Sequence, residues 1–222
     1  MHQGFQARKS GMSINVAEIK ANLQKSYNAD AARRDQGVKS DWKIEERAHF
    51  LALLQKEAAS TLLEIGAGPG YDSLFFSENG LDVTATDLSP EMVKLCLQKG
   101  ITAHVRDFYN LGFPAESFDA VWALNCLLHV PSADLPQVLT NIQSVLKPGG
   151  LFYYGVYGGV DEEGIYENDR LEPKRWFTRY LDDDLKAAVD SFFKIEYFKA
   201  IPLEDDGPGH FQSMILRKNN DK

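Results

Sequence analysis

The sequence predicts an α/β fold in which helices cover both faces of a mostly parallel sheet. Between residues 61 and 157, short apolar runs alternate with helical segments of about 10 to 15 residues, which is the pattern of a parallel sheet. The apolar runs are nearly continuous, as expected for strands buried on both faces. Residues 194–218 instead carry two alternating runs joined by a turn. We therefore expect the sheet to close with a strand pair that includes an antiparallel strand.

Turn residues and helix caps set the expected boundaries of these elements. Strands are expected at 61–66, 81–87, 101–107, 118–125, 151–157, 194–203 and 210–218. Helices are expected at 16–26, 44–58, 72–80, 88–100, 132–150 and 182–193. Ser89 should cap the helix that follows it, with Pro90 at the first helical position. Ser132 should cap the helix before the fifth strand.

Composition and charge exclude several classes of protein. The chain has 24 basic and 32 acidic side chains, a net charge of −8, which argues against a nucleic-acid partner because phosphate affinity comes from Lys and Arg. No run approaches the roughly 20 apolar residues of a membrane span. Cys96 and Cys126 lie among apolar residues, and no cysteine or histidine has metal-ligand spacing. We expect a cytoplasmic protein with reduced core cysteines, no metal and no membrane partner.

The length of 222 residues suits one sizeable domain and is too short for two. Residues 1–11 are polar and basic and read as a loose tail or an expression leader, with Met12 as an alternative start. We expect residues 1–43 to form a tail and a pocket-covering segment. Residues 44–222 should form a single domain that carries an insertion at 158–181.

The stretch LLEIGAGPGYDSLFF, residues 62–76, places three glycines between an expected strand and an expected helix. Glycine allows a ligand to approach the backbone closely, and a helix N-terminus offers free N–H groups. A dinucleotide-binding turn, G-x-G-x-x-G, would need its third glycine where Tyr71 stands. The G-K-[ST] ending of a phosphate-binding P-loop is absent as well. The spacing therefore argues against both of these phosphate-binding turns.

The pattern E-x-G-x-G-x-G at 64–70 resembles motif I of the class I methyltransferases that use S-adenosyl-L-methionine (SAM). Asp87 ends the second expected strand, where that family keeps an acid, and RDF at 106–108 ends the third. FDAVWALNCLLHV at 118–130 and VLKPGGLFYYGVY at 145–157 are similar to the later elements of the family. The five features follow one another at the intervals of the family.

This resemblance implies a Rossmann-like, doubly wound sheet of seven mostly parallel strands with an antiparallel C-terminal strand, in a three-layer α/β/α arrangement. It also implies SAM as the cofactor and S-adenosyl-L-homocysteine (SAH) as the product. Methyl transfer from a sulfonium is an in-line displacement, so the principal task of such a protein is to align the two reactants.

The resemblance implies where the cofactor lies. Asp87 would accept hydrogen bonds from the ribose hydroxyls, although an acid there also suits the ribose of NAD. Asp107 would lie beside the adenine, with the Phe108 backbone at the ring edge, although Asp107 could equally cap a turn. Met92 would pack on the adenine, or in the core. The other expected cofactor contacts are Glu64, Gly66, Ala67, Gly68, Gly70, Leu88 and Asn125.

Further side chains are expected at the glycine turn and beside the methyl-transfer position. Glu64 stands in an apolar strand, where an unpaired carboxylate is costly, so it should hold the glycine turn or face the cationic end of the cofactor. Asn125 and His129 bracket the loop after the fourth strand. His129 and Tyr157 are candidate catalytic residues, and His210 is a weaker candidate base. For His129 a purely structural role is the alternative.

The N-terminal segment has no fixed motif, but it contains three candidate contacts. Tyr27 and Trp42 are expected to cover the pocket, and Arg47 is expected to reach the carboxylate of the methionine moiety. Ordinary surface or core packing is the alternative for each of them.

The acceptor side should be formed by this segment and by residues 155–181, which are long enough for a lid and rich in aromatic side chains. The alternative is a surface excursion packed on the sheet edge. Lys174, Arg175 and Arg179 could meet an anionic substrate. No Asn/Asp-Pro-Pro-aromatic motif is present, which favours a small-molecule acceptor over nucleic acid.

Three alternatives to a small-molecule methyltransferase remain open from sequence. The first is a tRNA or protein methyltransferase of the same fold, which would show a basic strip beside the pocket. The second is a NAD-dependent oxidoreductase, and the third is a SAM-binding protein without catalysis.

Overall fold

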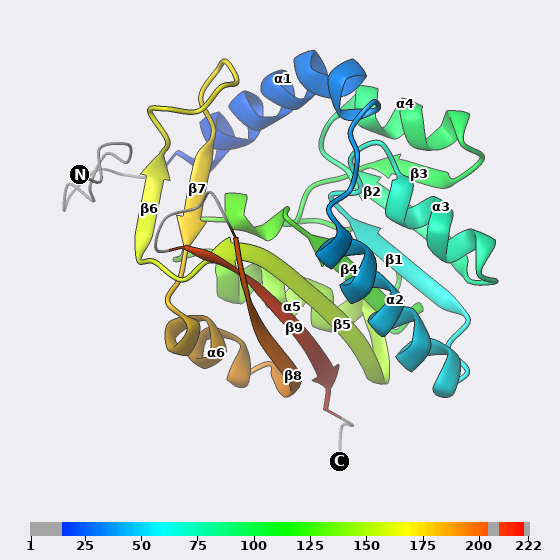
Figure 1. Ribbon diagram of the computed structural model, residues 1–222. Coiled ribbons are helices and arrows are strands. Elements are labelled where there is room, and N and C mark those ends of the chain that lie inside the picture. The colour runs from blue at the N-terminus through cyan, green and yellow to red at the C-terminus, as the bar shows by residue number, and fades with distance from the viewer. Residues whose placement is uncertain (1–14, 204–208, 220–222) are drawn as a thin grey trace.

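A computed structural model describes residues 15–203 and 209–219, arranged around one seven-stranded sheet (Figure 1). Its strands are β1 (Thr61–Ile65), β2 (Asp82–Asp87), β3 (Thr102–Val105), β4 (Phe118–Leu124), β5 (Leu146–Gly158), β8 (Phe193–Pro202) and β9 (His210–Lys218). A separate two-stranded sheet pairs β6 (Glu162–Ile165) with β7 (Trp176–Arg179). The expected tail at 1–11, with Met12, and most of the turn at 204–209 lie outside the described residues.

Six α-helices and one short 3-10 helix complete this part of the chain. They are α1 (Val16–Arg34), α2 (Asp41–Lys56), α3 (Tyr71–Glu78), α4 (Pro90–Gln98), η1 (Leu127–His129), α5 (Leu135–Val145) and α6 (Asp182–Asp190). None of these helices is long and apolar enough to cross a membrane.

The sheet has the order β3-β2-β1-β4-β5-β9-β8 and confirms the predicted fold class. Strands β1 to β5 run parallel, β9 pairs antiparallel with β5, and β8 pairs antiparallel with β9. The chain passes outward from β1 through β2 to β3, then returns to β4 on the other side of β1. The carboxyl ends of β1 and β4 therefore flank the point where the strand order reverses, which is where open α/β sheets bind ligands.

Helices cover both faces of the sheet because its side chains alternate between the two faces. On one face, the Trp122 and Tyr153 rings stack at 3.9 Å between centroids, and Phe50 of α2 packs on Trp122 at 5.4 Å. Helices α3 and α4 cover the same face. On the other face, Val121 belongs to the core that includes Leu139 of α5 and residues of α6. This arrangement confirms the three predicted layers.

Helix caps follow the prediction at one site and differ at another. Ser89 caps α4, since its hydroxyl accepts a hydrogen bond from the Met92 N–H at 3.2 Å. Ser132 does not cap α5, which begins at Leu135. The Ser132 N–H and hydroxyl instead donate to the Glu163 carboxylate at 2.7 and 2.8 Å. This serine ties β6 to the loop after β4, because a carboxylate accepts both of its donors.

Helix α1 is longer than expected, Val16–Arg34 rather than 16–26, and lies above the carboxyl ends of the parallel strands between α4 and the β6–β7 hairpin (Figure 1). The sequence underestimates it because α1 has no continuous apolar stripe: Ser26 and Asp30 are among its buried residues. Helix α2 begins three residues before its expected start, at Asp41.

The core predicts a clear contrast between two leucines on helices. Leu139 on α5 is fully buried, whereas the Leu97 side chain on α4 is 55% exposed. We expect Leu139→Ala to lower the free energy of unfolding by about 2–5 kcal/mol and Leu97→Ala to change it by less than about 0.5 kcal/mol. Urea denaturation of both variants measures this. Equal losses would contradict the assignment of α5 to the core.

Candidate active site

A cavity of about 560 Å³ opens at the carboxyl ends of β1, β2 and β4, beneath α1 and the start of α2. This volume lies within the range of about 300–1,000 Å³ that is typical of small-molecule sites. Twelve residues predicted from sequence line it: Tyr27, Arg47, Glu64, Gly66, Ala67, Gly68, Asp87, Leu88, Met92, Phe108, Asn125 and His129.

Four predicted residues lie outside this lining, for different reasons. The Trp42 ring packs on Phe211 at 4.3 Å between centroids rather than over the cavity. Asp107 pairs with Lys20 and accepts the backbone N–H groups of two following residues, so it caps a turn, the alternative left open from sequence. The Tyr157 hydroxyl accepts a hydrogen bond from Lys43, which lies between it and the cavity. Gly70 packs closely against Cys96.

The three glycines of the β1–α3 turn have different roles. A side chain at Gly66 would come within 2.3 Å of the Cys126 Cβ, and one at Gly70 within 2.8 Å of the Cys96 sulfur. These two glycines are required by packing against the core. Only Gly68, at φ +57°, has open space where a side chain would stand. A ligand in the cavity can therefore approach the backbone at Gly68.

The Asp87 carboxylate joins two turns at the ends of neighbouring strands. It accepts hydrogen bonds at 2.8 Å from the Gly68 N–H and at 2.8 Å from the Ser89 N–H. Each of these bonds goes to a different oxygen, so each oxygen keeps a lone pair for a further donor. Burial raises the pKa of Asp87 above its usual range. Asp87 can thus accept two hydroxyl donors of a ligand.

A cluster of charged side chains surrounds the inner end of the cavity. Asp72 on α3 pairs with Lys39 and, at 2.9 Å, with Arg47. Glu64 is buried and accepts a hydrogen bond from the Ser73 hydroxyl. Burial, together with the neighbouring Asp72 charge, raises the pKa of Glu64 to about 8. Glu64 is therefore neutral at pH 7, and its contact with Ser73 joins β1 to the first turn of α3.

Two polar atoms in the lining are buried without a hydrogen-bond partner in the described part of the chain, Asn125 Oδ1 and Arg47 Nε. Unpaired buried polar atoms are rare because their desolvation is costly. Asn125 also has a φ of +57°, and its N–H donates to the Gly155 carbonyl at 2.7 Å. One acceptor and one donor are thus available to a ligand.

His129 belongs to a buried chain of hydrogen bonds. Its Nδ1 lies 2.6 Å from the Trp176 carbonyl, which can only accept, so Nδ1 carries the proton. Its Nε2 therefore accepts from the Tyr27 hydroxyl, 2.6 Å away, and that hydroxyl accepts from Arg175 Nη1 at 2.9 Å. Burial lowers the pKa of His129 to about 3. With its basic nitrogen occupied, His129 is a poor general base in this arrangement.

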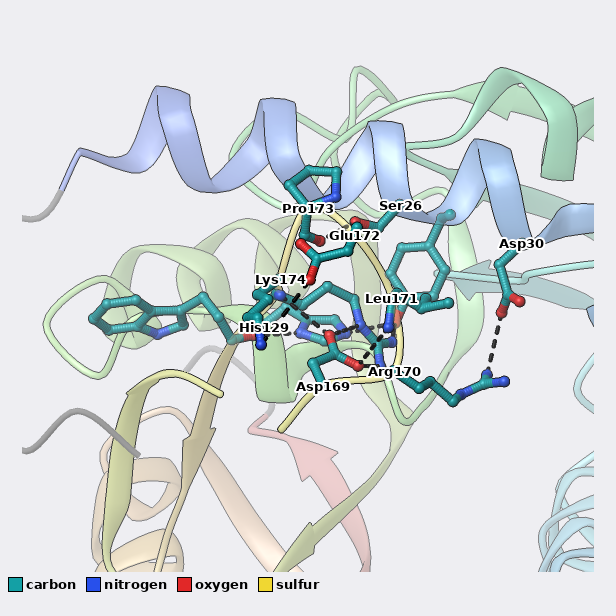
Figure 2. Close-up of polar contacts among 12 residues, drawn as sticks. Ser26, Asp30, His129, Asp169, Arg170, Leu171, Glu172, Pro173 and Lys174 are labelled. Atoms are coloured by element: carbon teal, nitrogen blue, oxygen red, sulfur yellow. Dashed lines mark hydrogen bonds and ion pairs between the residues drawn. The ribbon is translucent and has the colours of Figure 1, made fainter. Parts of the chain in front are cut away.

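The insertion is fixed to α1 by polar contacts, which Figure 2 shows. Asp30 of α1 accepts a hydrogen bond from Arg170 at 3.2 Å, and the Ser26 hydroxyl donates to the Pro173 carbonyl. Both carboxylate oxygens of Asp169 accept from one edge of the Arg175 guanidinium, from Nε at 2.7 Å and from Nη2 at 2.8 Å. Helix α1 and the insertion are therefore fixed to each other, and we call the pair the roof, although no residue of 155–181 is among those that line the cavity.

The cations expected to meet an anionic substrate are engaged within this roof. Arg175 is bound by Asp169, Lys174 donates to the Glu167 carbonyl, and Arg179 lies 3.8 Å from a Glu162 oxygen. His210 is also remote from the cavity lining, since its Nε2 contacts Asp182 at 2.7 Å.

The sequence predicted a pocket-covering segment within residues 1–43 but did not identify most of the individual contacts made by the α1–α2 connection. That connection and the adjoining turns lack any motif, so only their place in the fold reveals them. The missed lining residues include Leu23, Arg34, Val38, Lys39, Lys43, Ile44, Asp72 and Phe75. Within the described residues, no group of three or more His, Cys, Asp or Glu side chains could hold a metal ion.

Comparison with known proteins agrees with this geometry. Residues 63–154 match the family described as Methyltransferase domain. Sterol 24-C-methyltransferase ERG6B of Gibberella zeae is 32% identical over 173 residues, which are 72% of this chain and 43% of that protein. Ubiquinone biosynthesis O-methyltransferase of Xanthomonas axonopodis pv. citri is 32% identical over 114 residues, 48% of this chain and 47% of that protein. The chain thus spans less than half the length of these relatives.

A solved structure shares the fold across nearly the whole chain. The 1,6-didemethyltoxoflavin-N1-methyltransferase of Burkholderia thailandensis, solved with 1,6-didemethyltoxoflavin and SAH, has a TM-score of 0.72 and is 22% identical. The likeness covers 94% of this chain and 92% of that one. Residues 63–154 therefore match a methyltransferase domain, and the strand order and overall structure are those of the methyltransferase fold.

The raised pKa of Glu64 predicts a dependence of stability on pH. Its folded pKa of about 8 exceeds the ordinary value of 4.5, so the stability it contributes is complete below about pH 4.5 and is lost as the pH rises through 8. We expect Glu64→Gln to gain stability relative to the wild type between pH 5 and pH 8. Urea denaturation at several pH values measures the difference. The exposed Glu78 at the end of α3 is the control, and Glu78→Gln should show no such trend. A constant difference between Glu64→Gln and wild type would contradict the assignment.

The lowered pKa of His129 predicts the opposite trend. Its folded pKa of about 3 lies below the unfolded value of about 6.5, so stability is complete above pH 6.5 and falls as the pH drops toward 3. His129→Gln should lose less stability than wild type between pH 6.5 and 4.5, by about 1.4 kcal/mol per pH unit. Denaturation across this range measures the slope. His104, which is exposed on β3, is the control: His104→Gln should keep the wild-type slope.

Proposed function

We propose that the chain is a SAM-dependent methyltransferase that acts on a small molecule. The observation that carries the proposal is the juxtaposition of Gly68 and Asp87 at the ends of β1 and β2, where both line one cavity. The named relatives, a sterol and a ubiquinone-biosynthesis methyltransferase, act in small-molecule chemistry and support the same reading.

The lining residues fit such a cofactor. Asp87 has two free lone pairs for the hydroxyls of a ribose, and Gly68 leaves open space beside its backbone. Asn125 Oδ1 and Arg47 Nε, both buried and unpaired within the described residues, supply an acceptor and a donor for the amino-acid end. The Asp87 carboxylate, which has no Lys or Arg within ion-pair distance in the described residues, is the acidic group that this part of the lining presents to a ligand.

When bound, SAM supplies a methyl group on a cationic sulfur. The acceptor atom would attack the methyl carbon in line with the carbon–sulfur bond, and the sulfur would leave as a neutral thioether. The residues of this chain bind and orient, and orientation alone can supply effective molarities of about 10⁵–10⁸ M. Asp87 and the Gly68 backbone fix the nucleoside end, and Asn125 stands at the end of β4 beside the methyl position. His129 keeps the Tyr27 hydroxyl in place rather than acting as a base.

The roof over the cavity favours a small acceptor over a nucleic acid or a protein. Helix α1 and the segment 169–175 close over the strand ends, and Arg170, Arg175 and Arg179 pair with carboxylates there. A phosphate backbone needs a set of available cations. The net charge of −8 acts in the same direction.

The turn geometry also argues against a NAD-dependent oxidoreductase. Tyr71 occupies the position of the third dinucleotide glycine, and its hydroxyl donates to the Asp35 carbonyl at 2.5 Å. Calorimetric titration with SAM, SAH and NADH tests the proposal: SAM and SAH should bind, and NADH should not. Preferential binding of NADH would overturn it. Turnover of SAM in a panel of metabolites then distinguishes an enzyme from a protein that only binds SAM.

Asp87 provides the sharpest test of the cofactor site. Asp87→Ala removes charge-assisted hydrogen bonds, so we expect SAM affinity to fall by roughly 10-fold or more. Calorimetry of SAM binding measures this. Asp82, which is exposed at the opposite end of the same strand, is the matched control, and Asp82→Ala should bind SAM as the wild type does. An unchanged affinity in Asp87→Ala would show that the ribose partner is another residue.

A further inference from the structure

Four cations line the cavity, and one of them differs from the rest. Arg34 Nε lies 3.0 Å from an Asp30 oxygen, while Lys39 and Arg47 both pair with Asp72. Lys43 has no carboxylate within 4.0 Å in residues 15–203 and 209–219. Among the four cations of the lining, Lys43 is therefore the one that no carboxylate of the described residues neutralises, so its charge is available to a ligand.

Lys43 is held in place by neutral groups. Its ammonium donates to the Tyr157 hydroxyl at 3.3 Å and lies 5.1 Å from the centre of the Trp42 ring and 5.6 Å from that of Tyr157. Aromatic rings and a hydroxyl stabilise an ammonium group but do not neutralise it. Because Lys43 is half-buried, part of its desolvation cost remains without an anion to offset it.

The position of Lys43 places it on the acceptor side of the cavity. Tyr157, which holds it, stands near the end of β5, and Asn125 follows β4, its neighbour in the sheet. Asp87 ends β2, on the other side of β1. If the nucleoside end of the cofactor is fixed at Asp87, the acceptor approaches over β4 and β5, where Lys43 lies.

Apolar side chains continue the lining next to Lys43. Val38 is 99% exposed and Ile44 is 43% exposed, and both border the cavity. Large apolar side chains left in water at the rim of a cavity favour a ligand that covers them. A charged group at Lys43 and an apolar surface beside it together specify an amphipathic molecule.

We infer that the methyl acceptor is a small amphipathic acid: its anionic group binds the Lys43 ammonium, and its apolar part covers Val38 and Ile44. This inference rests on the proposed function, because it takes the Asp87 side of the cavity as the cofactor site. The Tyr157 hydroxyl, which accepts from Lys43, holds the ammonium group in place from outside the lining. Lys43 thereby takes the role that the sequence assigned to Lys174, Arg175 and Arg179.

A matched pair of probes tests the inference. 4-Hexylbenzoate and 4-hexylbenzamide share an apolar tail and differ in charge, and each is titrated by calorimetry into protein saturated with SAH. The acid should bind the wild type at least about 10-fold more tightly than the amide, because a charge-assisted hydrogen bond is lost in the amide. Lys43→Gln should abolish that preference, and Lys43→Arg should retain it.

Lys56, an exposed lysine at the end of the same helix, provides the control. Lys56→Gln should keep the preference of the wild type for the acid. The inference is overturned if the acid does not bind, if acid and amide bind equally, or if Lys43→Gln retains the preference. Saturable SAH binding in the same samples separates the two proposals: without it the proposed function fails, and with it only the inference about the acceptor fails.

Discussion

The Asp87 carboxylate is the point on which the rest of the site depends. By accepting the N–H groups of Gly68 and Ser89, it fixes the glycine turn of β1 to the start of α4. Ser89 in turn contacts the Asn28 side chain of α1 at 2.5 Å, and the neighbouring Tyr27 reaches His129. One buried acid thus links two strand ends to the helix that roofs the cavity. The raised pKa of Asp87 reflects the burial that this position demands.

The fold from β1 to β5 could be predicted from sequence because local signals there agree with one another. Gly66 and Gly80 mark the ends of a strand and a helix, and Ser89 with Pro90 marks a helix start. Helix α1 could not be predicted in full, since it buries polar residues against the insertion and has little apolar periodicity. The β6–β7 hairpin was likewise missed, because its fixing partners, such as Asp30, are far away in sequence.

The candidate site was predicted where it rests on strand ends and missed where it rests on packing between distant segments. Asp87 and Asn125 follow strands directly, so their position at one edge of the sheet is a consequence of topology. Asp107 also follows a strand, but it pairs with Lys20 of α1, a contact that the local sequence does not predict. The glycine turn is a further example, since Gly66 lines the cavity as predicted, but the requirement for glycine there comes from its close packing on Cys126.

Opposite charges on two sides of the cavity explain how it could hold two ligands at once. The Asp87 carboxylate lies on the proposed cofactor side without a cation partner in the described residues, whereas Asp72 is paired with both Lys39 and Arg47. Lys43 stands across β1 with its charge available. A cationic donor and an anionic acceptor would then sort to different ends of one cavity and attract each other across the point of transfer. Methyl transfer removes the positive charge of the sulfonium. The electrostatic attraction between the donor side and SAH would then be weaker than its attraction to SAM, whereas Lys43 would still attract the anionic group of the methylated acceptor.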